Sequence, residues 1–262
     1  MDQQVAQRLG EVDGVHQAVV FAQVDSTNAE ARRRIDAGGG PGLVVAADRQ
    51  TAGRGRRGRS WDDVAGGNLA LTVVVALPRR PTLLPLVAAL AVRDVLADRA
   101  IATSWKWPND VRAVVDGRPR KCAGILVETA SWSGGTGPRQ VGIVGIGVDV
   151  DWRGVERSGD AGAWTSLAEV GGTDVDVGDL AVDLVTALHE RLAALARDPD
   201  LVRRTAADGC DTLGRRVRVE GERRVLVGRA RDLTDDGALV LDVDGTEVVV
   251  TAGDVVHLRD AP

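Results

Sequence analysis

The chain has 262 residues, of which 44% are hydrophobic and 27% charged, and its formal net charge at pH 7 is −5. The acidic total argues against a general nucleic-acid binder, and no apolar run approaches membrane-spanning length. Cys122 and Cys210 provide no disulfide framework, and three scattered histidines have no metal-ligand spacing. Because no signal region opens the chain, we expect a cytoplasmic protein with one medium and one small domain.

The first part of the chain alternates predicted strands and helices. A branched stretch over residues 18–24 predicts a strand, and the capping-box spacing of Thr27 and Glu30 predicts a helix that starts near Asn28. A short buried strand, a longer strand and an apolar helix are expected over residues 43–47, 68–77 and 83–96.

Strands dominate the rest of the prediction. They are expected over residues 104–107, 111–115, 123–128 and 141–150, before an amphipathic helix over residues 180–196. After Asp208-Gly209 the sequence pattern changes. It predicts four short Val/Leu/Arg strands with tight turns, which is typical of a small all-β barrel. We therefore divide the chain into a domain over residues 1–207 and a barrel over residues 208–262.

The least ordinary segment is residues 50–61, a loop with three glycines and four arginines that ends in Trp61. Glycines permit positive φ and a close backbone approach, and arginines supply planar cationic forks. Such a loop can wrap a small anion with its backbone N–H groups. On the loop alone, a solvated basic turn or a nucleic-acid patch is an equally good interpretation.

Lysine is the second unusual feature. The chain has 33 Lys and Arg residues, yet only Lys106 and Lys121 are lysines. Each lies beside a strand-like segment, where a compact ammonium group could meet a charged ligand. On composition alone, the positions of these two lysines could equally be a coincidence.

Taken in order, several short motifs resemble one known family. They occupy residues 25–28, 50–61, 106–110, 121–126, 145–147, 164–167 and 251–254. In this order and at these spacings the chain is similar to the biotin protein ligases. The resemblance implies an α/β fold: a mixed sheet with flanking helices, similar to class II synthetases, plus a C-terminal SH3-like barrel. It implies ATP-dependent attachment of biotin to a lysine of a biotin carboxyl carrier domain, through a biotinyl-adenylate.

The resemblance also implies roles for individual residues. Lys121 and Arg56 match catalytic positions that face the biotin carboxylate and the phosphate, where fixed cations help two anions react. Biotin-binding positions are Ser26, Thr27, Asn28, Gln50, Gly53, Arg54, Gly55, Arg56, Lys121 and Gly124. Nucleotide-binding positions are Arg54, Arg56, Arg59, Trp61, Lys106, Asn109, Asp149 and Trp164. Without the resemblance, Ser26 and Thr27 could simply be helix caps.

Two departures from the family pattern matter. Asp149 stands where the family usually has asparagine, and we expect its carboxylate to accept one hydrogen bond from the exocyclic amine of adenine. About twenty residues precede the first motif, too few for the DNA-binding domain of some members, so we expect the monofunctional form and no DNA partner.

Several further expectations accompany the resemblance. Mg²⁺ would accompany ATP, although no protein ligand for it is derived, and residues 151–164 would form a lid that orders over adenine. We expect no membrane partner and a monomer or weak homodimer. A lipoate or octanoate transferring relative and an arginine-loop nucleic-acid binder are the alternatives.

Overall fold

The structure is a computed structural model that describes residues 1–62, 64, 66–134, 139–155, 163–171, 174–221 and 224–258. Its helices are α1 (Gln3–Gly10), α2 (Thr27–Asp36), α3 (Leu84–Asp98), α4 (Leu167–Gly171), α5 (Val177–Arg197) and α6 (Pro199–Asp208). Short 3₁₀ turns are η1 (Arg56–Gly58) and η2 (Pro81–Leu83).

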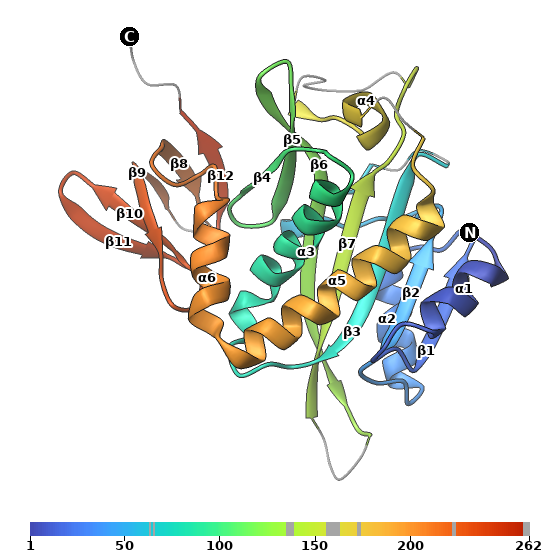
Figure 1. Ribbon diagram of the computed structural model, residues 1–262. Helices are drawn as coiled ribbons and strands as arrows, with labels where there is room; N and C mark the ends of the chain where they lie inside the picture. The colour runs from blue at the N-terminus through green and yellow to red at the C-terminus, as the bar shows by residue number, and fades with distance from the viewer. Residues whose placement is uncertain are drawn as a thin grey trace.

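The main sheet has seven strands in the order β1-β2-β3-β7-β6-β5-β4 (Figure 1). These strands are β1 (Gln17–Phe21), β2 (Leu43–Ala47), β3 (Asn68–Ala76), β4 (Thr103–Lys106), β5 (Asp110–Val115), β6 (Arg118–Trp132) and β7 (Arg139–Asp149). β1 and β2 pair in parallel, and the other pairs are antiparallel. The predicted mixed sheet with flanking helices is therefore confirmed.

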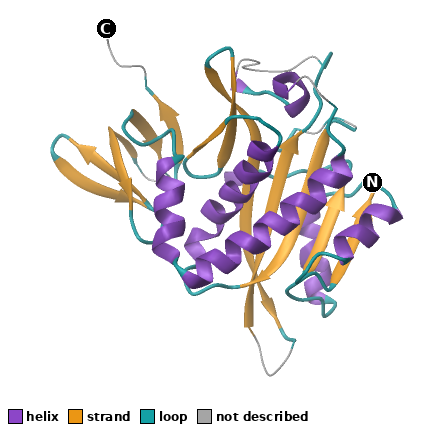
Figure 2. Ribbon diagram, in the orientation of Figure 1, coloured by secondary structure: helices purple, strands orange, loops and turns teal. Residues whose placement is uncertain are grey.

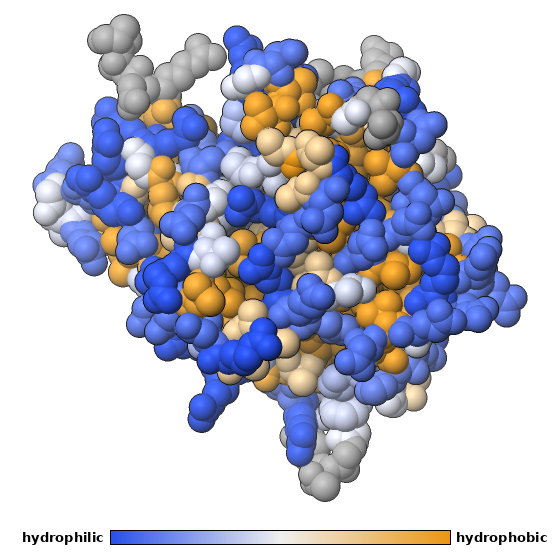
Figure 3. Space-filling model, in the orientation of Figure 1, coloured by the Kyte–Doolittle hydropathy of each residue, from blue (hydrophilic) through white to orange (hydrophobic). Residues whose placement is uncertain are grey.

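Helices cover both faces of this sheet (Figure 2). Because successive side chains of a strand point to opposite faces, Val44 of β2 joins the larger core with α3 and α5, while Val45 packs with Ile35 of α2. This burial on both sides explains why β2 reads as a continuous apolar run. On the face seen in Figure 3 hydrophilic side chains predominate, and apolar side chains form small separate patches.

A second, antiparallel sheet follows α6, in the order β11-β10-β9-β8-β12. Its strands are β8 (Arg216–Glu220), β9 (Val225–Leu233), β10 (Leu239–Val243), β11 (Thr246–Val250) and β12 (Asp254–His257). The predicted tight turn at Asp244-Gly245 is present, with positive φ at both residues as in a type I′ hairpin. The expectation of four strands was wrong, because β12 pairs with β8 to add a fifth.

Other local features also differ from the sequence-based expectations. The amphipathic helix α1 and the short helix α6 were not predicted, and β6 is longer than its apolar stretch suggests. The predicted capping box is absent: Ser26 is the N-cap of α2, it makes no side-chain cap, and Thr27 already lies inside the helix. Ser26 and Thr27 instead line the cavity described below.

Candidate functional site

A cavity of about 380 Å³ opens between the main sheet, the glycine–arginine loop and the C-terminal sheet. Nearly all of the predicted site residues line it, although they come from distant parts of the chain. They are Ser26, Thr27, Asn28, Gln50, Arg54, Gly55, Arg56, Arg59, Trp61, Lys106, Asn109, Lys121, Gly124 and Trp164. The fold therefore brings the separate motifs to one place.

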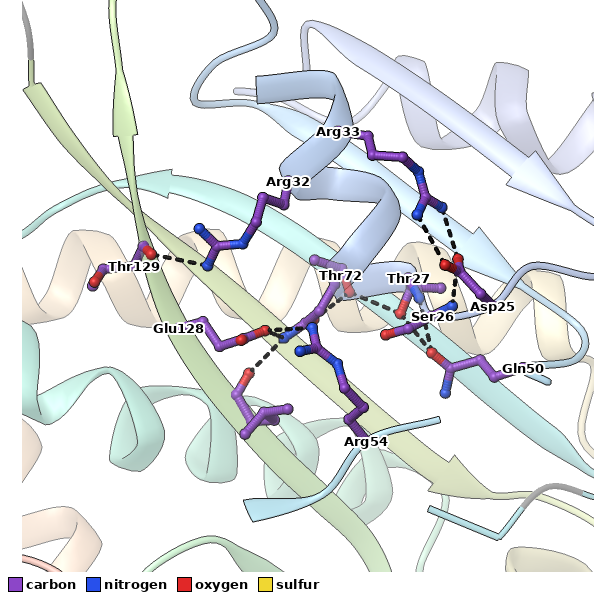
Figure 4. Close-up of polar contacts among 12 residues, drawn as sticks. Asp25, Ser26, Thr27, Arg32, Arg33, Gln50, Arg54, Thr72, Glu128 and Thr129 are labelled. Atoms are coloured by element: carbon purple, nitrogen blue, oxygen red, sulfur yellow. Dashed lines mark hydrogen bonds and ion pairs between the residues drawn. The ribbon is translucent and has the colours of Figure 1, made fainter. Parts of the chain in front are cut away.

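One end of the cavity is built from neutral, buried groups at the start of α2 (Figure 4). The Thr27 backbone N–H donates to Gln50 Oε1 at 2.8 Å, and the Thr27 and Thr72 hydroxyls lie 2.9 Å apart. The Thr72 hydroxyl donates to Asn28 Oδ1 at 2.7 Å. Thr27 and Asn28 are each 4% exposed, so this end is rigid and largely dry.

The other end is cationic, and the glycine–arginine loop supplies most of the charge. Arg56 donates to Asn109 Oδ1 and to the Gly253 carbonyl, each at 3.3 Å. Burial lowers the pKa of the Arg56 guanidinium, which Asp254 and Asp110 partly offset. Burial likewise lowers the pKa of the Lys106 ammonium. A bound anion would stabilise the charged form of both groups.

The loop is also held from the C-terminal sheet. Arg59 forms an ion pair with Asp254 at 2.5 Å, and Arg57 pairs with the same carboxylate at 3.3 Å and donates to the Glu220 carbonyl. Arg57 adopts a left-handed conformation, with φ of 57°. Asp254 therefore fixes the side of the loop that faces away from the main sheet.

Lys121 sits at the centre of the cationic end. Its Nζ is 2.7 Å from Asp110 Oδ1, and it lies 5.1 Å and 4.8 Å from the ring centroids of Trp61 and Trp164. The two indoles meet edge to face with centroids 6.4 Å apart. One carboxylate and two aromatic faces thus hold the ammonium group in place.

Glycines make room for Trp61. Gly124 of β6 and Gly147 of β7 are register partners, and a Cβ on either would come within 2.6 Å or 2.8 Å of the Trp61 ring. Any larger residue at these two positions would displace the indole. Gly147 was quoted in a motif but was not predicted as a site residue.

Two predicted residues do not line the cavity. Gly53 is buried behind it, against Gln50 and the Trp61 backbone. Asp149 is only 3% exposed, and its Oδ1 accepts from Asn68 Nδ2 at 2.9 Å. Asn68 in turn accepts from the Val64 N–H, so the pair anchors the chain that follows Trp61. Asp149 therefore lies behind the cavity wall, and its expected contact with adenine stays a prediction.

The predicted lid over residues 151–164 lies partly outside the described residues, which omit 156–162. Cys122 is buried, and burial raises the pKa of its thiol to about 12, in keeping with packing rather than reactivity. Within the described ranges, no cluster of three or more His, Cys, Asp or Glu residues could hold a metal ion. No described helix is long and apolar enough to cross a membrane.

Sequence patterns alone do not single out Thr72 or Glu128. Thr72 lies among the apolar residues of β3, and Glu128 follows an apolar run as an ordinary surface glutamate would. A polar residue at a buried strand position was the available signal for Thr72. For Glu128 only the three-dimensional neighbours reveal a role.

Comparisons with known proteins agree with this geometry. Residues 20–149 match the biotin/lipoate A/B protein ligase family, and residues 212–258 match the biotin protein ligase C terminal domain. The chain is 40% identical to a biotin--[acetyl-CoA-carboxylase] ligase of Mycobacterium tuberculosis, over 97% of this chain and 93% of that relative. It is 33% identical to the Escherichia coli bifunctional ligase/repressor BirA, over 97% of this chain and 78% of BirA.

Solved structures are similar over most of the chain. A biotin protein ligase from Aquifex aeolicus in complex with biotin and ATP matches with a TM-score of 0.73 and 26% identity, over 92% of this chain and 98% of that one. A Leishmania major biotin protein ligase in complex with biotinyl-5-AMP matches with a TM-score of 0.58 and 27% identity, over 92% and 99%. Motifs, fold and relatives agree, and the chain belongs to the biotin protein ligase family.

Proposed function

We propose that this chain attaches biotin to a lysine of a biotin carboxyl carrier domain, consuming ATP through a biotinyl-adenylate. The observation that carries the proposal is one cavity with a neutral, hydrogen-bonding end and a cationic end. Biotin has the same division, because its ureido ring is neutral and polar and its valerate carboxylate is charged. The names of the most similar relatives support the same reaction.

In the first step the biotin carboxylate attacks the α-phosphorus of ATP, and pyrophosphate leaves. Both reactants are anions, so preorganised cations lower the barrier. Arg56 and Lys121 are assigned to this step because each is partly buried and faces the cavity. Asp110 keeps Lys121 in position, and the incoming anions would share its ammonium group.

Arg54, Arg59, Lys106 and Asn109 are assigned to the triphosphate, and Trp61 and Trp164 to the flat faces of the ligand. Mg²⁺ bound to phosphates typically takes only one or two protein carboxylates. Asp110 is the cavity carboxylate beside Lys121 and fits that need. Mg²⁺ would neutralise phosphate charge there, while Lys121 and Arg56 orient the reacting oxygens.

In the second step the carrier lysine amine attacks the acyl carbon of the adenylate, the bond to phosphate breaks, and AMP leaves. Closure of the glycine–arginine loop would keep water from the mixed anhydride. We further propose that the chain divides into domains over residues 1–207 and 208–262. The protein would act in the cytoplasm as a monomer or weak homodimer, without a DNA partner.

The test is to incubate the protein with biotin, Mg²⁺-ATP and an isolated carrier domain and to record the mass of the carrier. Addition of one biotinyl group, dependent on ATP, is expected. Calorimetric titrations with biotin, lipoate and duplex DNA distinguish the alternatives. Binding of lipoate or DNA in preference to biotin would overturn the proposal.

A further inference from the structure

Glu128 lies immediately behind the cavity wall, on β6, and does not line the cavity itself. Its Oε2 nevertheless accepts hydrogen bonds from two residues that do, Asn28 Nδ2 at 2.8 Å and Arg54 Nη2 at 3.1 Å (Figure 4). Glu128 therefore connects the buried start of α2 with the first arginine of the glycine–arginine loop.

The contact with Glu128 decides which way the Asn28 amide is turned. A carboxylate and a backbone carbonyl can only accept hydrogen bonds. Glu128 Oε2 and the Leu126 carbonyl, at 2.8 Å and 3.3 Å, must therefore face the Asn28 NH₂ group. The Asn28 oxygen is consequently turned toward Thr72, and it too can only accept.

The orientation of the Asn28 amide in turn determines the direction of the hydrogen bonds made by Thr72 and Thr27. Each hydroxyl has one hydrogen, and that of Thr72 is taken by Asn28 Oδ1 at 2.7 Å. Two hydroxyl oxygens 2.9 Å apart need a hydrogen between them, so the hydrogen of Thr27 points to the Thr72 oxygen. Thr27 then has no hydrogen left to donate into the cavity. Thr72 is 0% exposed, so no water can reverse the arrangement.

We propose that Glu128 is a positioning residue that determines specificity, because it makes Thr27 a hydrogen-bond acceptor toward the ligand. The matching ligand group is an N–H donor, such as those of the cyclic urea of biotin. This inference rests on the proposed function. A ligand with an oxygen in place of that N–H would meet the lone pairs of Thr27 and be rejected.

The test compares the unmodified chain with Glu128→Gln and Glu128→Ala, using calorimetric titration without nucleotide. The probes are biotin and the two cyclic carbamates in which oxygen replaces one ureido N–H. Glutamine can donate as well as accept and alanine does neither, so only the longer contact with the Leu126 carbonyl would still orient the Asn28 amide. Loss of one oriented hydrogen bond should weaken biotin binding by roughly threefold to tenfold. The preference for biotin over at least one carbamate should shrink by a similar factor.

Glu30→Gln is the matched control, because Glu30 forms ion pairs with Arg33 and Arg34 on α2 and contacts no cavity residue through them. It should bind all three probes as the unmodified protein does. Unchanged preference in both Glu128 variants, or equal weakening of biotin and carbamates, would overturn the inference while leaving the proposed function intact. Failure of the unmodified protein to bind biotin would overturn both.

Discussion

The two ends of the cavity are stabilised in different ways. At the α2 end, Thr27, Asn28 and Thr72 bond to one another and are almost fully buried, at 4%, 4% and 0% exposure, and Glu128 holds Asn28 from behind the cavity wall. At the loop end, Arg57 and Arg59 form ion pairs with Asp254, and the Arg59 side chain is 63% exposed. The first arrangement holds without ligand, whereas exposed ion pairs are weak and readily exchanged for ligand anions.

This difference suggests a division of labour. A buried network with fixed donors and acceptors selects a ligand by its hydrogen-bond pattern before any chemistry occurs. Arg57 and Arg59 are solvated and are held by Asp254, so their strongest electrostatic interaction is expected with the phosphates of a bound nucleotide. Variants at the two ends should consequently separate biotin binding from adenylate formation.

The largest effect is expected at the cationic end. Lys121→Ala or Arg56→Ala should slow biotin-dependent pyrophosphate release by roughly two or more orders of magnitude, because two anionic reactants lose a preorganised cation. Arg231→Ala, which removes an ion pair with Asp242 in the C-terminal sheet, is the control and should have normal activity. Near-normal pyrophosphate release in both site variants would exclude them from this step.

At the neutral end, Thr27→Val keeps the shape of the side chain and removes its hydroxyl. Biotin affinity without nucleotide should fall by up to about tenfold, as expected for one hydrogen bond. Calorimetry measures the affinity, and the KM for ATP should hardly change. A larger effect on ATP than on biotin would contradict the assignment of this end.

A smaller effect is expected from Asp254→Asn, which removes the charge that orients Arg57 and Arg59. The KM for ATP should rise about twofold to fivefold, a change typical of exposed ion pairs, and less at high salt. Asp242→Asn is the matched control in the same sheet. A lower KM for ATP would show instead that Asp254 competes with the phosphates.

The last of these predictions concerns stability and pH, and it leaves activity near neutral pH unchanged. Burial and, to a lesser extent, repulsion from Lys106, Arg112 and Arg215 together lower the pKa of His257 from its ordinary 6.5 to about 3. Between these values the unfolded chain binds a proton that the folded protein does not, so acidification from pH 6.5 toward 3 destabilises the fold. His257→Gln should flatten this dependence in urea unfolding series, and parallel curves would contradict the assignment.

The motifs could be predicted from the sequence because each has an unusual composition. The glycine–arginine loop and the two lysines were identified on that basis, and the fold brings them together. Asp149 could not be placed, since strand periodicity does not say whether a polar side chain meets a ligand or Asn68. Glu128 and Thr72 were missed because their partners lie far away in the chain.

The fifth C-terminal strand was missed for a similar reason, since β12 depends on pairing with β8. Helix α1 is anchored by Asp2, whose side chain caps its first turn, a signal that was present in the sequence but not used.

The most direct test of the two-ended site is calorimetric titration with biotin, in the absence of nucleotide, of Thr27→Val and Arg59→Ala side by side. The account predicts that Thr27→Val weakens biotin binding by up to about tenfold, whereas Arg59→Ala binds biotin as the unmodified protein does. Equal weakening in both variants would contradict it, because Arg59, which is assigned to the triphosphate, would then be part of biotin recognition.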